Sequence, residues 1–243
     1  MQSIIVIPAR IGSTRFPAKV LTPILGKPMI QYVYEGAKES VLAEAVLVAT
    51  DSIDVVNVVK DFGGEAVLTS PSLPSGTDRV YEAVKDVDVK YIVNLQGDEP
   101  LIRGNILDAI FEELFKEEAD IVTPCYKTTN IKEAKNPNRV KITTDKKGCA
   151  LYFSRSSIPY HREPSSKVEF RIHIGIYGFT KRSLSRFVSL PQSELEKTEK
   201  LEQLRALENG MSIRVVEVDF RPIPVDVPED VLKVERVLKR FRK

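Results

Sequence analysis

The strongest constraint on the fold is a regular alternation, in the N-terminal half, of short apolar runs with segments of helical periodicity. Residues 4–7 are continuously apolar and end at Pro8, which is typical of a strand buried on both faces of a sheet. Further strand-like runs occupy 45–49, 65–68, 91–95 and 121–123, and helical patterns occupy about 28–39, 52–60, 77–85 and 104–117. Strands that alternate with helices predict a doubly wound, mostly parallel α/β sheet.

The pattern changes between about residues 125 and 180. Segments 140–143, 150–153 and 173–179 have strand character, which predicts a small antiparallel subdomain. Beyond it, residues 194–208 predict one helix, with a Ser193/Glu196 capping box at its start and Gly210 after its end. A strand at 212–218 and a closing helix at 229–242 follow. We expect residues 1–243 to form a single domain that carries this subdomain.

Composition excludes several classes of protein. The net charge is only +2 and the basic residues are spread along the chain, so we expect no nucleic-acid partner. No apolar run reaches the roughly 18–20 residues that span a bilayer, and nothing resembles a signal peptide. We therefore expect a cytoplasmic protein without membrane association. Cys125 and Cys149 are far apart and lack a CxxC motif, which favours two inert thiols.

A basic loop follows the first strand. It gathers Arg10, Arg15 and Lys19 around a Gly12-Ser13 corner, at a strand end where open α/β sheets bind ligands. Three cations and free backbone N–H groups suit a nucleoside triphosphate, which carries about four negative charges. The loop lacks both GxxxxGK[ST] and GxGxxG, so it is neither a Walker A loop nor a dinucleotide fingerprint. The alternative is a solvated basic turn.

Two aspartates are candidate metal ligands. Asp98 follows the strand at 91–95 and the turn-permissive Gly97, and a carboxylate there suits Mg²⁺, which takes one or two carboxylates plus substrate phosphates. Asp98 could instead be a simple turn residue. Asp226 lies in the segment Pro-Val-Asp-Val-Pro-Glu, which is also a good helix start. Asp226 therefore either binds metal or only caps the last helix.

Smaller signals are more ambiguous. Ser75-Gly76 opens a helix, so these residues either cap it or read a base edge. Strand alternation places His173 and Tyr177 on one face, where a lone histidine is either structural or functional. Glu202 and Gln203 flank the apolar stripe of a helix, a position that is usually solvated.

Taken together, these segments resemble the 3-deoxy-manno-octulosonate (KDO) cytidylyltransferases. The resemblance covers nearly the whole chain and is closest at 7–19, 25–30 and 94–100, with further matches at 136–138, 151–155, 173–178 and 201–205. It implies a nucleotide-diphospho-sugar transferase-like fold. It also implies transfer of CMP from CTP to the anomeric hydroxyl of KDO, giving CMP-KDO and pyrophosphate for lipopolysaccharide biosynthesis.

The resemblance implies roles for individual residues. The CTP phosphates would be held by Arg10, Ser13, Arg15 and Lys19. Cytosine would lie against Ser75 and Gly76, with Gln96 at the junction of the two substrates. Asp98 and Asp226 would bind Mg²⁺, with two ions in the reactive complex, and would form the catalytic set with Lys19. The KDO pocket would consist of Arg155, His173, Tyr177, Glu202 and Gln203.

Within that pocket, Arg155 is the candidate for the sugar carboxylate, because a guanidinium forks onto a carboxylate. The subdomain at about 125–180 would bind the sugar and form a homodimer. Two alternatives are a cytidylyltransferase for another acid sugar, such as a sialic acid, and a non-catalytic nucleotide-binding regulator. The presence of both Asp98 and Asp226 disfavours the regulator.

Overall fold

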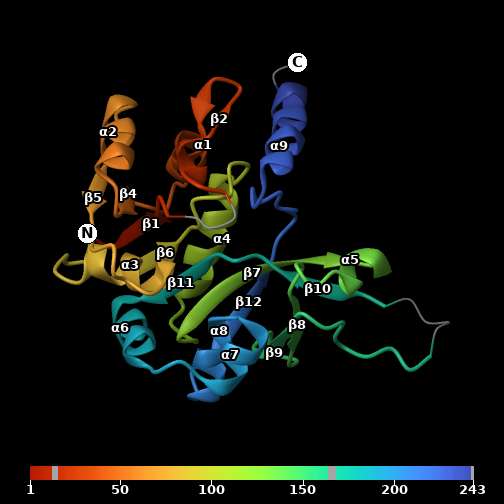
Figure 1. Ribbon diagram of the computed structural model, residues 1–243. Helices are drawn as coiled ribbons and strands as arrows, with labels where there is room; N and C mark the ends of the chain where they lie inside the picture. The colour runs from red at the N-terminus through yellow and green to blue at the C-terminus, as the bar shows by residue number, and fades with distance from the viewer. Residues whose placement is uncertain (13–15, 164–167, 242–243) are drawn as a thin grey trace. The chain divides into compact units, whose positions relative to one another are not determined.

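The computed structural model describes residues 1–12, 16–163 and 168–241 (Figure 1). The chain divides into two compact units. The first comprises Met1–Asp108 and Arg221–Lys243, and the second comprises Ala109–Phe220. The second unit is thus larger than the antiparallel segment at 125–180.

The first unit contains a parallel sheet with strand order β5-β4-β1-β6. Its strands are β1 (Ser3–Ala9), β4 (Ala45–Thr50), β5 (Ala66–Leu68) and β6 (Tyr91–Asn94). Its helices are η1 (Lys19–Leu21), α1 (Met29–Lys38), α2 (Ile53–Asp61), α3 (Gly76–Val84) and α9 (Pro228–Phe241). A short hairpin of β2 (Pro23–Ile24) and β3 (Lys27–Pro28), which the sequence did not predict, precedes α1.

The strand order of this sheet confirms the doubly wound prediction. The chain runs from β1 outward to β4 and β5, and then returns to place β6 on the other side of β1. The order therefore reverses between β1 and β6, and open α/β sheets bind ligands at the carboxyl ends of strands at such a point. Every residue of β1 is buried, as the continuous apolar run predicts.

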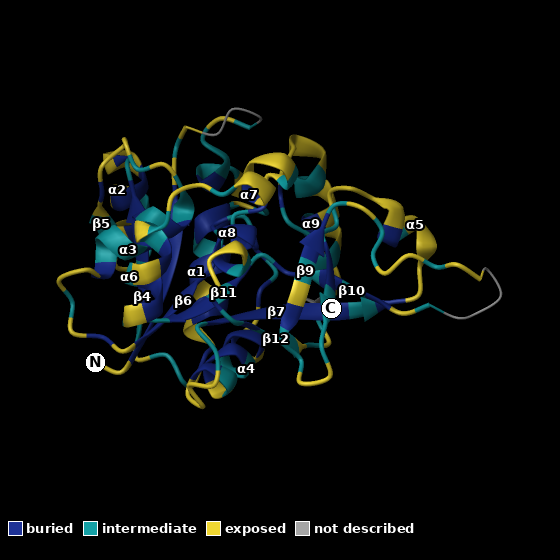
Figure 2. Cartoon of the chain, turned by 90° about the horizontal axis from the view of Figure 1, so that it is seen from below, coloured by how far each residue is buried: buried dark blue, intermediate teal, exposed yellow. Residues whose placement is uncertain are grey.

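The second unit contains a mostly antiparallel sheet around β7 (Ile121–Thr128), which is buried along nearly its whole length (Figure 2). One edge of β7 pairs with β10 and β11 in antiparallel fashion, and β12 pairs with it in parallel. The other strands are β8 (Lys141–Thr144), β9 (Ala150–Ser154), β10 (Phe170–His173), β11 (Tyr177–Thr180) and β12 (Ile213–Glu217). The predicted antiparallel excursion is therefore present.

The helices of the second unit are α5 (Ile131–Lys135), α6 (Lys181–Ser189), α7 (Glu194–Glu199) and α8 (Gln203–Glu208). Helix α4 (Gly104–Leu114) begins in the first unit and ends in the second. None of the helices in the described ranges combines the length and apolar character that a membrane span needs.

Two segments of this unit that the sequence predicted as single elements are each divided in the structure. The segment 173–179 is divided into β10 and β11, which both run antiparallel to β7 in the same direction, by a tight local turn in which the N–H of Ile176 donates to the carbonyl of Ile174 at 2.7 Å. The segment 194–208 is two helices, because Lys200 adopts a left-handed conformation with φ of 53°. The Ser193/Glu196 capping box predicted at the start of α7 is present.

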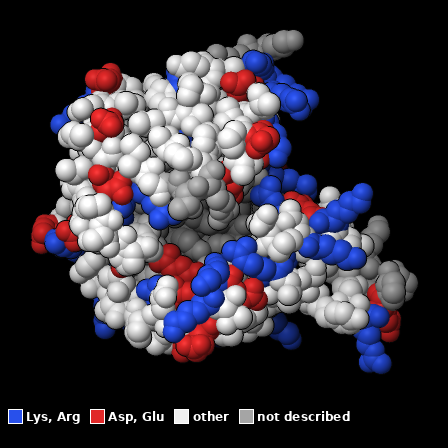
Figure 3. Space-filling view, viewed as in Figure 1, with Lys and Arg blue, Asp and Glu red and all other residues white. Residues whose placement is uncertain are grey.

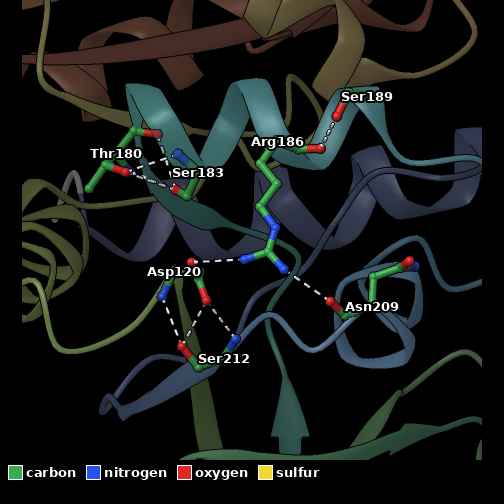
Figure 4. Close-up of polar contacts among 7 residues, drawn as sticks. All are labelled: Asp120, Thr180, Ser183, Arg186, Ser189, Asn209 and Ser212. Atoms are coloured by element: carbon green, nitrogen blue, oxygen red, sulfur yellow. Dashed lines mark hydrogen bonds and ion pairs between the residues drawn. The ribbon is translucent and has the colours of Figure 1, made fainter.

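Helix α6 was not predicted, although it has its own start signal. Thr180 and Ser183 form a capping box at its N-terminus (Figure 4). Arg186 then links the helix to the rest of the unit, with Nη1 3.7 Å from Asp120 and Nη2 donating to the carbonyl of Asn209 at 3.0 Å. The Asp120 carboxylate also accepts two hydrogen bonds from Ser212, so β7, β12 and α6 are joined at one end.

Acidic and basic side chains lie beside one another over the lower half of the face in Figure 3, where Figure 1 places α6, α7 and α8. Pairs such as Lys197–Glu194, at 2.9 Å, are exposed and contribute at most about 1 kcal/mol each. The Arg205–Glu196 pair differs, because both side chains are buried and two hydrogen bonds of 2.7 and 2.8 Å connect them. This pair joins α8 to α7 across the break at Lys200.

Candidate functional site

A cavity of about 350 Å³ opens in the first unit at the carboxyl ends of β1 and β6, which is the point where the strand order reverses. Its volume lies within the range of small-molecule sites, about 300–1,000 Å³. The predicted site residues that line it are Arg10, Lys19, Ser75, Gly76, Gln96, Asp98 and Asp226. Ser13 and Arg15, also predicted here, lie outside the described residues.

At the centre of this cavity, Lys19 lies between the two aspartates. Its Nζ is 2.7 Å from Oδ2 of Asp98 and 3.7 Å from Oδ1 of Asp226. The lysine side chain is mostly buried, whereas Asp226 is about half exposed. A single ammonium thus approaches two carboxylates that are 128 residues apart in the chain (226 minus 98), so the folded protein brings together the two predicted metal ligands.

The backbone fixes this arrangement. The N–H of Val225 donates to the carbonyl of Asp98 at 3.0 Å, which joins the segment before α9 to the end of β6. Gly97 allows a close approach of the backbone, because a Cβ there would make a tight contact of 3.1 Å with the carbonyl oxygen of Pro8. Asp230, rather than Asp226, accepts hydrogen bonds from the backbone at the start of α9, from Asp226 and Val227 at 3.1 and 3.2 Å. Asp226 therefore has its carboxylate near Lys19 instead of at the helix end.

The opposite wall of the cavity begins at α3. Ser75 caps this helix, because its Oγ accepts from the N–H of Asp78 at 3.2 Å. A Cβ on Gly76 would lie 3.4 Å from Pro8 and 3.6 Å from Oε1 of Gln96, so α3 packs closely on the end of β1. The side-chain amide of Gln96 is oriented by its hydrogen bond to Asn94 at 3.2 Å. Ser75 thus has the predicted capping role and also lines the cavity.

Sequence reasoning missed a buried ion pair behind this wall. Arg79 is 3% exposed, and its Nη2 lies 3.1 Å from Oδ2 of Asp51. Oδ1 of the same aspartate accepts from the N–H of Ile11 at 3.0 Å, so the pair fixes the backbone of the basic loop. The signal was present in the sequence, because Asp51 directly follows a parallel strand just as Asp98 follows its own strand closely.

A second polar cluster lies in the second unit, where the structure brings together His173, Tyr177 and Gln203. The rings of His173 and Tyr177 have centroids 5.4 Å apart, and the Tyr177 hydroxyl donates to Oε1 of Gln203 at 3.1 Å. Nε2 of His173 lies 2.9 Å from the hydroxyl of Thr123. Although 173–179 is not one strand, the two predicted residues are neighbours.

Burial sets the protonation of this cluster. It lowers the pKa of His173 to about 3, so the imidazole is neutral at physiological pH. Burial, together with the charge of Glu202, raises the pKa of Tyr177 well above its usual value, so the phenol remains a donor. Nε2 of Gln203 is buried and has no hydrogen-bond partner within the described part of the chain. A buried donor without an acceptor is costly, about 1–3 kcal/mol.

Arg155, also predicted for the sugar pocket, is held by backbone carbonyls. Nε donates to Glu199 at 2.7 Å, Nη1 to Pro137 at 3.0 Å and Nη2 to Lys200 at 3.3 Å. Three of the five guanidinium N–H groups are therefore used within the protein. The two Nη contacts are exposed, so one N–H on each Nη remains for a ligand.

Comparison with known proteins identifies the family. Residues 4–213 match the cytidylyltransferase family. The chain is 45% identical to a 3-deoxy-manno-octulosonate cytidylyltransferase of Thermodesulfovibrio yellowstonii, over 99% of this chain and 100% of that protein. It is 47% identical to a protein of the same name from Elusimicrobium minutum, over 98% of each chain.

Solved structures extend the comparison. A CMP:2-keto-3-deoxy-manno-octonic acid synthetase complexed with CTP matches with a TM-score of 0.94 and 40% identity, over 99% of this chain and 100% of the other. A 4-diphosphocytidyl-2C-methyl-D-erythritol synthase from Anaerococcus prevotii matches with a TM-score of 0.65 at 12% identity, over 98% of each chain, which shows a shared fold. The chain therefore belongs to the cytidylyltransferase family and, within it, to the 3-deoxy-manno-octulosonate cytidylyltransferases.

Proposed function

We propose that this enzyme transfers CMP from CTP to the anomeric hydroxyl of KDO and releases pyrophosphate. The observation that carries the proposal is the approach of Lys19 to both Asp98 and Asp226 in a cavity at the carboxyl ends of β1 and β6. The names of the full-length relatives, which are KDO cytidylyltransferases, supply the two substrates.

Mg²⁺ is the proposed cofactor, with Asp98 and Asp226 as its protein ligands. The approach of both carboxylates to the single ammonium of Lys19 supports this, because it places two negative charges around one point. Two carboxylates are as many as Mg²⁺ usually takes when phosphates supply the other ligands. In the part of the chain that the structure describes, no cluster of three or more His, Cys, Asp or Glu offers another metal site. Bound there, Mg²⁺, together with a second ion held by the phosphate oxygens, would supply positive charge to the triphosphate.

The protein's own cations complete the phosphate site. Lys19 and Arg10 line the same cavity, and Arg10 has no ion-pair partner among the described residues, so it is available for a phosphate. In-line attack of the sugar hydroxyl on the α-phosphorus then depends mainly on positioning and on charge neutralisation. Covalent catalysis is not required. Burial raises the pKa of Cys125 to about 11, so this thiol is not a ready nucleophile.

The sugar site is proposed at the polar cluster of the second unit. Neutral His173 and the Tyr177 phenol suit recognition of sugar hydroxyls, and the unpaired Nε2 of Gln203 supplies a further donor. The remaining N–H groups of Arg155 suit the carboxylate of an acid sugar. Glu202, which precedes Gln203 at the start of α8, is proposed to accept from a hydroxyl.

We further propose a cytoplasmic homodimer that forms through the second unit. Three large apolar side chains of this unit are strongly exposed, and they support a buried contact surface: Ile131 at 58%, Leu151 at 62% and Tyr160 at 87%. Both cysteines are free, as expected in a reducing compartment.

A competition assay tests the sugar. The enzyme is given CTP, Mg²⁺ and equal concentrations of KDO and N-acetylneuraminate, and the CMP-sugars are identified by mass spectrometry. The proposal predicts CMP-KDO as the dominant product. Dominant CMP-N-acetylneuraminate would contradict KDO and retain the cytidylyltransferase, whereas CTP binding without either product would favour a regulatory protein.

A further inference from the structure

Lys141 is a fully buried cation that the proposed reaction does not use. It lies in β8, its side chain is 0% exposed, and its ammonium donates to three backbone carbonyls: Asn136 at 3.1 Å, Arg139 at 2.6 Å and Arg155 at 2.5 Å. These three bonds use all of its donors. Burial lowers the pKa of Lys141 to about 8, so most of the side chain is still charged at pH 7. Burying a charge costs free energy, so the presence of this lysine in the interior points to a role in the protein.

The position of Lys141 links two parts of the proposed sugar site. In the sheet it is opposite Ser154 of β9, the residue before Arg155, and on its other side it is opposite Ile172 of β10. The carbonyl of the preceding residue, Val140, accepts from the N–H of His173 at 2.8 Å. Displacing Lys141 would therefore shift the backbone at both Arg155 and His173.

Arg155, whose carbonyl is bound by Lys141, is also bonded to the break between α7 and α8. Its guanidinium holds the carbonyls of Glu199 and Lys200, as described above. In return, the Glu199 carboxylate accepts from the N–H of Arg155 at 2.9 Å and from Oγ of Ser154 at 2.6 Å. These contacts fix the α7 end immediately before Lys200, whose left-handed backbone sets the direction of α8.

The first residues after this break are those proposed to contact the sugar. Glu202 and Gln203 begin α8, and Gln203 accepts the hydrogen bond of Tyr177. A series of hydrogen bonds thus leads from Lys141 through Arg155 to Glu199, and the chain itself leads from Glu199 through Lys200 to Gln203, which accepts from Tyr177.

We infer that Lys141 is a positioning residue for the acid-sugar site, which sets the places of Arg155 and of the α7–α8 break without touching the substrate. A purely structural role predicts something different. If the role is only structural, an apolar side chain of similar length would avoid the cost of a buried charge. Any loss of activity would then parallel the change in stability and would be the same for both substrates. The inference rests on the proposed sugar site, so its test includes a readout that does not need KDO.

The test compares Lys141→Met with two control variants of the neighbouring residue, Ile142→Val and Ile142→Ala. Ile142 is 1% exposed in the same strand, and its side chain points to the opposite face, so its truncation lowers stability without removing a bond of the series. Melting temperatures are measured for all variants, so that the two controls bracket the stability of Lys141→Met.

We expect Lys141→Met to raise the KM for KDO about tenfold, the factor that about 1.4 kcal/mol gives, with CTP affinity measured without sugar unchanged within about twofold. The Ile142 variants are expected to leave the KM for KDO near the wild-type value. An unchanged KM in Lys141→Met, or an equal rise in an Ile142 variant of equal melting temperature, would overturn the inference.

Hydrogen–deuterium exchange of residues 199–203 gives the readout that is independent of the substrate. Lys141→Met should accelerate exchange there, and the controls should not, whether or not the wild-type enzyme uses KDO. Faster exchange in an enzyme that is inactive with KDO would retain the positioning role and contradict the proposed substrate. Unchanged exchange would overturn the positioning role. If Lys141→Met does not fold, Glu199→Gln takes its place. It should raise the KM for KDO about threefold and accelerate exchange of residues 199–203.

Discussion

At the scale of single residues, the cavity of the first unit brings one lysine close to two aspartates. Lys19 occupies the space beside Asp98 and Asp226 that the proposed cofactor would need, so the lysine and the metal compete for the same carboxylates. CTP resolves this competition in the proposed reaction, because its phosphates attract the ammonium and also supply ligands to the metal. In the proposed reaction, Lys19 would therefore connect nucleotide binding to metal binding.

Replacing Lys19 tests this competition directly. Lys19→Met should tighten the binding of Mn²⁺, used as a probe for Mg²⁺, by about tenfold in protein without CTP, because a charge-assisted hydrogen bond of about 1.5–3 kcal/mol no longer opposes it. Electron paramagnetic resonance measures free Mn²⁺. Weaker Mn²⁺ binding in this variant would contradict competition, and Asp226→Asn should weaken binding in either background.

Asp98 should be essential for turnover. Asp98→Asn keeps the size of the side chain and removes the charge, so we expect kcat to fall by about 10²–10³ with an unchanged circular dichroism spectrum. Asp88→Asn serves as the matched control, because Asp88 is an exposed aspartate outside the cavity. Turnover of Asp98→Asn within a few-fold of the wild type would refute its role.

His173 makes a prediction about pH. Its pKa is about 3 in the folded protein and near 6.5 in the unfolded chain, so the unfolded chain binds the proton first. The stability that the neutral ring contributes is complete above pH 6.5 and is lost as the pH falls toward 3, by up to about 1.4 kcal/mol per pH unit.

His173→Gln should remove this part of the pH dependence. Urea unfolding of both proteins between pH 7.5 and 4 measures it, and the difference between them cancels the titration of the carboxylates they share. Stability curves that stay parallel over this range would show that His173 does not carry the effect.

At the scale of elements, the parallel half was largely predictable because its signals are local. Continuous apolar runs marked β1, β4 and β6, and the helical segments between them predicted a parallel sheet, although the order of its strands came only from the structure. The break at Lys200 was not predictable, because a lysine with φ of 53° leaves no mark in the sequence. Neither was the Lys141 cluster, since a lysine in an alternating strand pattern usually faces solvent, whereas the ammonium of this one donates to the carbonyls of Asn136 and Arg139 just before it and of Arg155 after β9.

Helix α1 has a glycine where it packs against the segment before α4, although glycine is a poor helix former. Gly36 lies inside α1, where alanine would ordinarily gain about 1 kcal/mol. A Cβ at this position would lie 2.4 Å from the carbonyl oxygen of Ile102, which requires backbone movement.

Gly36→Ala should therefore lower the free energy of unfolding by about 1–3 kcal/mol, since overpacking outweighs propensity. Urea unfolding checks this, with Gly175→Ala as a control because a Cβ there meets nothing within 4 Å. A stabilised Gly36→Ala protein would show that propensity dominates.

At the scale of the whole molecule, the two units divide the predicted site residues between them. The residues proposed for CTP and metal belong to the first unit, and those proposed for the sugar belong to the second. This division was visible in the sequence only as a change of pattern near residue 125. The boundary at Ala109 lies inside α4, where no composition change marks it.

The proposed homodimer is tested by light scattering coupled to size-exclusion chromatography. We expect a mass of about twice the 27.3 kDa of one chain. Leu151→Asp, which places a charge on an exposed apolar residue of the second unit, should shift the mass toward one chain if that surface forms the contact. A wild-type mass of 27.3 kDa at micromolar concentration would contradict the dimer.

The central claim is that the enzyme joins CMP to KDO with a metal held by Asp98 and Asp226. Its most direct test is pyrophosphate release by the purified protein with CTP, Mg²⁺ and KDO, with each component omitted in turn. We expect rapid release only when all three are present. Equal release without KDO, or no release with all three present, would contradict it.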